Sequence, residues 1–138
     1  MKDLFTMEHI PPLGLEESLR RGELHAVQCP SREVLKDITS LWGVLILIAL
    51  RAGTHRYSEL RRKAPGVSEK MLSQTLRVLE SDGFITRTSY DVVPPHVIYD
   101  LTALGQSASD ELSSLVAWIE KNLPQIIEAR QLKKKAEV

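Results

Sequence analysis

The sequence has a single cysteine, Cys29, and no apolar run long enough to cross a membrane. One cysteine excludes a disulfide within the chain and favours a reducing compartment. The longest apolar run, residues 41–50, is far shorter than the roughly 20 residues of a membrane-spanning helix, so it predicts a buried core helix. No cleavable signal is evident, because no basic start is followed by an apolar stretch. We therefore expect a cytoplasmic protein with no membrane partner.

Motifs of common enzyme classes are also missing. The chain has no G-x-S-x-G, no glycine-rich phosphate loop and no pair of carboxylates in a cleft-like pattern. His25 and Cys29 are four residues apart and could supply two metal ligands, but His9, His55 and His96 offer no evident completion of such a site. We expect no enzyme, no cofactor and no metal site.

The chain lacks net charge, with 18 basic and 18 acidic residues, but the charges are unevenly distributed. Residues 51–90 carry 8 Lys/Arg against 4 Asp/Glu, whereas residues 1–50 and 91–138 each carry 5 against 7. A basic region confined to the middle of the chain indicates one surface for an anionic partner. The length of 138 residues is enough for one domain with its own core.

Hydrophobic periodicity and helix-stop signals predict a mainly helical chain with one hairpin. The expected helices are a weak one within 13–26, then 30–39, 41–51, 57–63, 68–82 and 102–122. Ser40, Ser68 and Thr102 are the expected N-caps. The expected strands are 84–90 and 97–101, joined by a loop over 91–96 whose tip is 92–95. Pro124 is expected to break or kink the last helix, and residues 131–138 to fray.

The helix that follows Ser68 has one apolar and one polar face. Its apolar stripe is Leu72, Leu76 and Leu79, and its polar face is Lys70, Ser73, Gln74 and Arg77. A helix, a short helix, a capped helix with a polar face and then a hairpin is the order of a winged helix-turn-helix, in which the capped helix enters the DNA major groove. The predicted fold is therefore α+β, mainly α, with other small α+β folds left open by the periodicity alone.

Basic and amide side chains on this face suit DNA. Lys and Arg can bind phosphate or guanine, and Gln suits adenine. The predicted DNA contacts are Ser68, Lys70, Ser73, Gln74 and Arg77 on the helix, Arg56, Arg61 and Arg62 as backbone contacts, and Arg87 and His96 beside the hairpin. An ordinary solvated surface is the alternative for each of them. Four aromatic residues are expected in the core: Trp42, Tyr57, Phe84 and Tyr99.

Several of these segments also carry a resemblance to a known family. They are Cys29-Pro30, Trp42, L-I-L-I-A-L (45–50), R-Y-S-E-L-R-R (56–62), P-G-V-S-E-K-M-L-S-Q-T-L-R-V-L-E-S-D-G (65–83), P-P-H-V-I-Y (94–99) and L-T-A-L-G (101–105). In this order and spacing the chain resembles the HxlR-type (DUF24, MarR-like) transcriptional regulators, from Cys29 to about Gly105. It departs at Ser40-Leu41, where the family usually has Gly-Lys, and at His96 and Ile98, where it usually has Arg and Glu. These departures leave the operator sequence open.

The resemblance implies a symmetric dimer on a pseudo-palindromic double-stranded operator. The long helix from Thr102 also has more apolar surface than a small wing needs to cover. We therefore expect an N-terminal dimerisation arm (1–28), a DNA-binding core (29–104) and C-terminal dimerisation helices with a tail (105–138). The alternative is that the terminal helices only close the core of the monomer. A regulator of this kind is expected to act as a repressor. A winged-helix module that binds protein instead of DNA is the main alternative.

Cys29 is the candidate sensor residue. A thiol at a helix N-terminus, one turn from Arg32, is expected to have a lowered pKa because the helix dipole favours the thiolate. In some family members a thiol here senses quinones, aldehydes or oxidants. With one cysteine per chain, the available products are adducts, overoxidation or a disulfide between the Cys29 residues of two subunits. The alternatives are a small buried structural residue and a regulator that responds to a ligand without thiol sensing.

Overall fold

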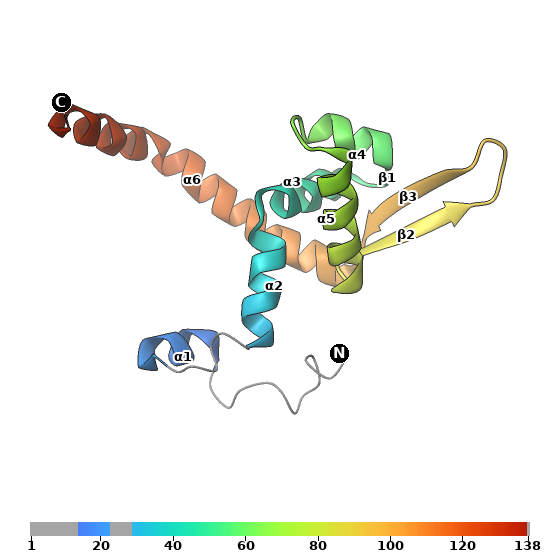
Figure 1. Ribbon diagram of the computed structural model, residues 1–138, viewed down its shortest axis with the longest axis horizontal. Coiled ribbons are helices and arrows are strands. Elements are labelled where there is room, and N and C mark those ends of the chain that lie inside the picture. The colour runs from blue at the N-terminus through green and yellow to red at the C-terminus, as the bar shows by residue number, and fades with distance from the viewer. Residues whose placement is uncertain (1–13, 23–28, 138) are drawn as a thin grey trace.

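The computed structural model describes residues 14–22 and 29–137 of the chain (Figure 1). The described elements are α1 (Leu15–Arg21), α2 (Pro30–Thr39), α3 (Leu41–Ala49), the 3-10 turn η4 (Leu50–Ala52), β1 (His55–Arg56), α4 (Tyr57–Lys63), α5 (Glu69–Ser81), β2 (Ile85–Tyr90), β3 (His96–Leu101) and α6 (Ala103–Ala136). This order confirms the predicted α+β, mainly α, winged helix-turn-helix. Residues 13 and 23–26 of the weak first helix lie outside the described residues.

Helices α3, α5 and α6 begin directly after the predicted N-cap residues. The side-chain oxygens of Ser40, Ser68 and Thr102 accept hydrogen bonds from the N–H groups three residues later, at 3.0 to 3.1 Å. Each cap satisfies one of the N–H groups that a helix start leaves without a partner. Pro30 occupies the first position of α2, where its missing N–H costs nothing. These local signals place the start of α5, which carries the predicted DNA face.

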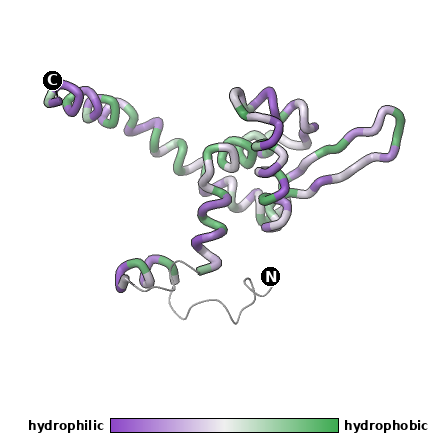
Figure 2. The backbone as a smooth tube through the Cα atoms, in the orientation of Figure 1, coloured by the Kyte–Doolittle hydropathy of each residue, from purple (hydrophilic) through white to green (hydrophobic). Residues whose placement is uncertain are grey.

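The apolar helix α3 is the centre of the core (Figure 2). Its buried residues Ile46 and Leu47 lie among the leucines of α5, and α3 also contacts α2, α4 and α6. Phe84 and Tyr99 are buried, while Trp42 and Tyr57 are partly buried and pack against the same cluster. The predicted core role of the four aromatic residues is confirmed, and so is the reading of residues 41–50 as a buried helix.

The sheet has three strands in the order β1-β3-β2, all antiparallel. One prediction is wrong here: His96 is not in the loop but pairs with Tyr90 as the first residue of β3. The sheet also has a strand that the sequence did not predict, β1, in which His55 pairs with Tyr99. A two-residue strand has no periodicity of its own, so only its pairing with a distant strand reveals it.

Helix α6 runs without interruption from Ala103 to Ala136, through Pro124. The helix therefore does not break at Pro124, and the kink expected there as the alternative stays a prediction. The expected fraying up to residue 136 is wrong, and one C-terminal helix takes the place of several. Pro124 lies on an exposed part of α6, where water can bind the Glu120 carbonyl that loses its helical partner. Only the first turns of α6 touch the core, through buried Gly105, Ser109 and Leu112. The rest projects from the body as an arm, residues 115–136 (Figure 1).

Candidate nucleic-acid interface

Helix α5 presents a polar face to solvent. Its inward side chains Leu72, Thr75, Leu76 and Leu79 are buried in the core. Lys70, Gln74 and Arg77 are exposed on the other side. Among the described residues, neither Lys70 nor Arg77 has an ion-pair partner. The face therefore keeps its positive charge and its amide free for a ligand.

Ser73 differs from the other residues of this face because it is half-buried. Its Oγ lies 3.2 Å from the Tyr57 hydroxyl, which donates to the Glu69 carbonyl at 3.1 Å. Since that carbonyl takes the only Tyr57 hydrogen, the Ser73 hydroxyl donates to Tyr57. This chain of bonds fixes α4 against the first turns of α5. The base contact predicted for Ser73 stays a prediction, and its hydroxyl hydrogen is committed to Tyr57.

The three basic residues at the end of α4, Arg61, Arg62 and Lys63, differ in their contacts. Arg61 forms an exposed ion pair with Glu69, at 2.9 Å, and so offsets the carboxylate beside the start of α5. Arg62 is exposed, with no ion-pair partner in the described part of the chain. Lys63 is exposed as well, but its ammonium lies 2.6 Å from Nε2 of buried His55. Because an ammonium only donates, Nε2 accepts, and the opposite Nδ1–H donates to the Gly53 carbonyl at 2.7 Å.

Two more predicted contacts lie at the hairpin, and Arg56 precedes α4. Arg87 is exposed on β2, opposite Tyr99 of β3. His96 stacks on Tyr90, with ring centroids 4.9 Å apart, and so stiffens the hairpin just before its tip. Arg56 is exposed, and its backbone N–H donates to the Glu59 carboxylate at 2.9 Å. The structure thus brings Arg77 and Arg87 to one side of α5 and leaves Arg56 on the far strand, β1.

Sequence reasoning missed two neighbours of Gln74. A shallow hollow of about 150 Å³ between α2 and α5 is lined by Gln74 together with Met71 of α5 and Lys36 of α2. Met71 is exposed despite being apolar, and apolar side chains can contact the thymine methyl group. Helical spacing placed Met71 at the border of the polar face, so it could have been found. Lys36 could not, because its approach to α5 depends on packing between two distant helices.

Cys29 is buried at the N-cap of α2, in the position that the sequence predicted. Burial acts to raise the pKa of its thiol, but hydrogen bonds from the Ser31 hydroxyl and from the N–H groups of Ser31 and Arg32 outweigh it and lower the pKa. The helix start thus favours the thiolate, as expected. A thiolate is the nucleophilic form of cysteine, so this environment promotes reaction once a reagent reaches the sulfur.

An acidic contact joins the helix of Cys29 to α5. Burial raises the pKa of Asp82, the C-cap of α5, to about 7, assisted by the nearby carboxyls of Asp37 and Glu33 on α2. A protonated Asp82 carboxyl is compatible with this crowding, because two neighbouring carboxylates repel unless one of them holds a proton. Helices α2 and α5 therefore meet through a contact with reduced charge.

The described ranges hold no group of three metal-ligating side chains and no helix suited to crossing a membrane. His25, the possible metal partner of Cys29, lies outside those ranges.

A mainly helical body, a capped helix with exposed cations and an adjoining hairpin define a winged helix-turn-helix regulator.

Comparison with known proteins gives the family. The model of the HxlR-like helix-turn-helix family matches residues 37–127, and the chain belongs to this family of transcriptional regulators. The HTH-type transcriptional regulator YtfH of Escherichia coli, itself uncharacterized, is 59% identical over 86% of this chain and 94% of its own length. These relatives confirm the expectation of a transcriptional regulator in place of an enzyme.

Solved structures agree with the family. The ytfH protein from Salmonella typhimurium, described as a transcriptional regulator, is 64% identical, with a TM-score of 0.74 over 79% of this chain and 97% of that one. The redox regulator HypR in its oxidized form is 34% identical, with a TM-score of 0.63 over 68% of this chain and 97% of that one.

Proposed function

We propose that the protein is a cytoplasmic, homodimeric repressor that binds a pseudo-palindromic operator through α5 and the β2–β3 hairpin. The observation that carries the proposal is the exposed face of α5, where Lys70 and Arg77 have no ion-pair partner among the described residues and the Gln74 amide is exposed beside them. A helix of this kind fits the major groove, and the hairpin beside it reaches the flanking backbone. A DNA-binding dimer can repress by occupying the site of polymerase.

The residues of α5 divide by the chemistry that they offer. Gln74 can bind adenine with two hydrogen bonds, and Met71 beside it can contact a thymine methyl group. Lys70 suits phosphate or guanine. Ser68 uses its oxygen as the N-cap, so its contribution to DNA binding is to orient the start of α5. Arg61 and Arg62 on α4 and Arg56 on β1 are proposed as backbone contacts, which position the protein without reading sequence.

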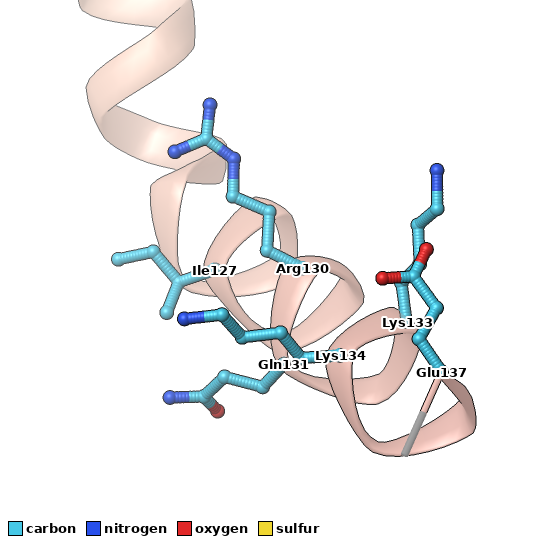
Figure 3. A pocket seen from close by; sticks show the side chains of 6 residues that line it. All are labelled: Ile127, Arg130, Gln131, Lys133, Lys134 and Glu137. Carbon is cyan, nitrogen blue, oxygen red and sulfur yellow. The ribbon is translucent and has the colours of Figure 1, made fainter.

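The arm of α6 supports the dimer. It carries large exposed apolar side chains on one side, namely Leu115, Trp118, Ile119, Leu123 and Ile127. A projecting helix with such a stripe is not stable alone in water, because it has no surface on which to bury the stripe. Near the end of the arm, Ile127 and Arg130 line an open hollow together with neighbouring residues of the same segment (Figure 3). A second copy of the chain, with its own arm and α1, is the proposed partner of the stripe.

Replacing Gln74 tests the recognition helix. Gln74→Ala is expected to lower affinity for the operator about tenfold while leaving affinity for an unrelated duplex unchanged, because a bidentate base contact is lost. The operator is first located by footprinting on fragments from the upstream intergenic region, and affinity is then measured by fluorescence anisotropy. Gln106→Ala, exposed near the start of α6 and outside the arm, is the matched control. Equal losses on both duplexes would show that Gln74 does not read sequence.

Thiol sensing is proposed for Cys29. Its lowered pKa and its place at the start of α2, which contacts α5 through Asp37 and Asp82, link the sulfur to the recognition helix. The relatives support this, since one structure is of a redox regulator, HypR, in its oxidized form and another is of diamide-treated YodB from Bacillus subtilis. In this chain the oxidised product is a Cys29 adduct or a disulfide between two subunits.

Cys29→Ser is therefore expected to abolish the response to oxidants. Diamide or a quinone should weaken operator binding by the wild-type protein at least about tenfold, whereas the variant should keep its affinity, because a hydroxyl does not react as a thiolate does. Mass spectrometry of the treated wild-type protein identifies the adduct or the linked dimer. Release of DNA by the treated variant would reject the thiol switch and favour a small-molecule ligand as the effector.

A further inference from the structure

A groove between α5 and the hairpin brings two arginines together. Its volume is about 460 Å³, and its lining combines Tyr57, Ser73, Leu76 and Arg77 with Arg87, Val97 and Tyr99 of the sheet. The hairpin leaves the body of the protein beside α5, so the groove lies between the recognition helix and the wing (Figure 1). Its position is that of a junction between the two elements that the proposed function assigns to DNA.

The strand register turns Arg87 toward this groove. Alternate residues of a strand point to opposite faces, so Arg87 shares a face with Ile85, which is buried in the core. The carboxylate nearest in register, Asp100, pairs with Thr86 and therefore lies on the other face, where it accepts a hydrogen bond from Thr54. The Arg87 guanidinium thus points along the core face and past its edge, on the side of α5.

The helix supplies the facing cation. Arg77 follows Ser73 by four residues and so lies on the same side of α5. Ser73 is anchored to Tyr57, and this bond holds that side of α5 against the other wall of the groove. None of the described residues that line the groove is acidic, and neither arginine has an ion-pair partner among them.

Two guanidinium groups on facing walls, without a carboxylate between them, repel each other and attract an anion. Each guanidinium offers five N–H donors in a planar fork that matches phosphate oxygens. We propose that this groove seats one phosphate of the DNA backbone, held jointly by Arg77 and Arg87. The assignment rests on the proposed function and refines it. Arg77 becomes a contact to the DNA backbone, and the bases are read by Gln74 and Met71, which lie toward the other edge of the polar face of α5.

The salt dependence of binding tests a shared phosphate. The logarithm of affinity falls with the logarithm of salt concentration, with a slope of about 0.9 for each phosphate neutralised. The double variant Arg77→Ala/Arg87→Ala is therefore expected to lose about one unit of slope, where two separate phosphate contacts would lose about two. Its affinity should fall roughly tenfold or more, by the same factor on the operator and on a scrambled duplex of equal length.

Control variants separate charge from folding. Arg87→Lys keeps the charge and should keep the slope, with a smaller loss of affinity, because only the planar fork is removed. Lys121→Ala removes one cation from the side of α6 opposite the apolar stripe and should leave both affinity and slope unchanged. Gln74→Ala should show the reverse pattern to the double variant, with a lower operator preference and an unchanged slope.

The outcomes distinguish the seat from the proposed function. A loss of about two slope units, or a loss confined to the operator, would overturn the shared phosphate seat. A wild-type protein that binds all duplexes alike would contradict sequence-specific regulation. The salt slope of the double variant would still test whether Arg77 and Arg87 share one phosphate. Submillimolar binding of inorganic phosphate that the double variant abolishes, measured by calorimetry, would assign the groove to a free anion and overturn the DNA assignment. Wild-type protein that binds no duplex would overturn both.

Discussion

Replacing Gly105 with alanine is expected to destabilise the protein strongly, although alanine is the better helix former. Gly105 lies in the first turn of α6, which packs directly on the chain where α5 leads into β2. A Cβ added there would lie 1.9 Å from the Phe84 carbonyl oxygen and 2.9 Å from its carbon. These are backbone atoms that cannot rotate away, so α6 or the hairpin must shift. We expect the free energy of unfolding to fall by about 3 kcal/mol or more, against the roughly 1 kcal/mol that alanine gains by propensity.

The measurement is urea unfolding at a fixed protein concentration, followed by circular dichroism. Gly14→Ala is the matched control, because a Cβ at Gly14 meets no atom of the described residues within 4 Å and φ there is −65°. That variant should change the free energy of unfolding by less than about 0.5 kcal/mol. If Gly105→Ala matched the stability of the wild type, the close contact between α6 and Phe84 would be wrong.

The second large effect is expected at the arm of α6. Ile119 lies in the middle of the apolar stripe and is 40% exposed in the single chain, so its burial depends on a partner. Ile119→Lys would place a charge in the proposed interface, and burying a charge there is costly. We expect a monomer in analytical ultracentrifugation and a loss of at least about 100-fold in affinity for a two-half-site operator, since linked binding to both half-sites is lost.

Two controls keep this result interpretable. Glu128→Lys introduces the same residue nine positions along α6, on the opposite side of the helix, and should leave the protein dimeric. Helicity and affinity for a single half-site should be unchanged in Ile119→Lys, because the core and α5 do not involve Ile119. A dimeric Ile119→Lys protein would place the interface elsewhere.

The domain boundary predicted after residue 104 stays a prediction. Helix α6 crosses that position without interruption, so the proposed dimerisation arm continues directly from the DNA-binding core.

Much of the DNA-binding core could be predicted because its signals are local. Ser40, Ser68 and Thr102 cap their helices as expected, and the leucine spacing of α5 placed its polar face correctly toward solvent. The hairpin could be predicted because its strands are rich in β-branched and aromatic residues. Such features depend on residues within a few positions of one another, so the order of the letters is enough to reveal them.

The errors and omissions arise from contacts between distant residues. Proline normally ends a helix, but α6 continues through Pro124. The Glu120 carbonyl, which loses its helical partner there, can bind water instead. The bonds of Ser73 to Tyr57 and of Arg61 to Glu69 link α5 to α4, and the bond of Lys63 to His55 links α4 to β1. Sequence periodicity does not predict any of them. They change which side chains of the basic region remain free. A list of basic residues therefore overstates the interface until the fold shows which cations already have partners.

The most direct test of the regulator is binding of the purified wild-type protein to fragments of its own upstream intergenic region at two salt concentrations. We expect one protected site with two half-sites about one helical turn apart, and an affinity that falls steeply between about 50 and 200 mM salt. Equal and weak binding to every fragment, with little dependence on salt, would contradict it and favour a winged-helix module that binds protein.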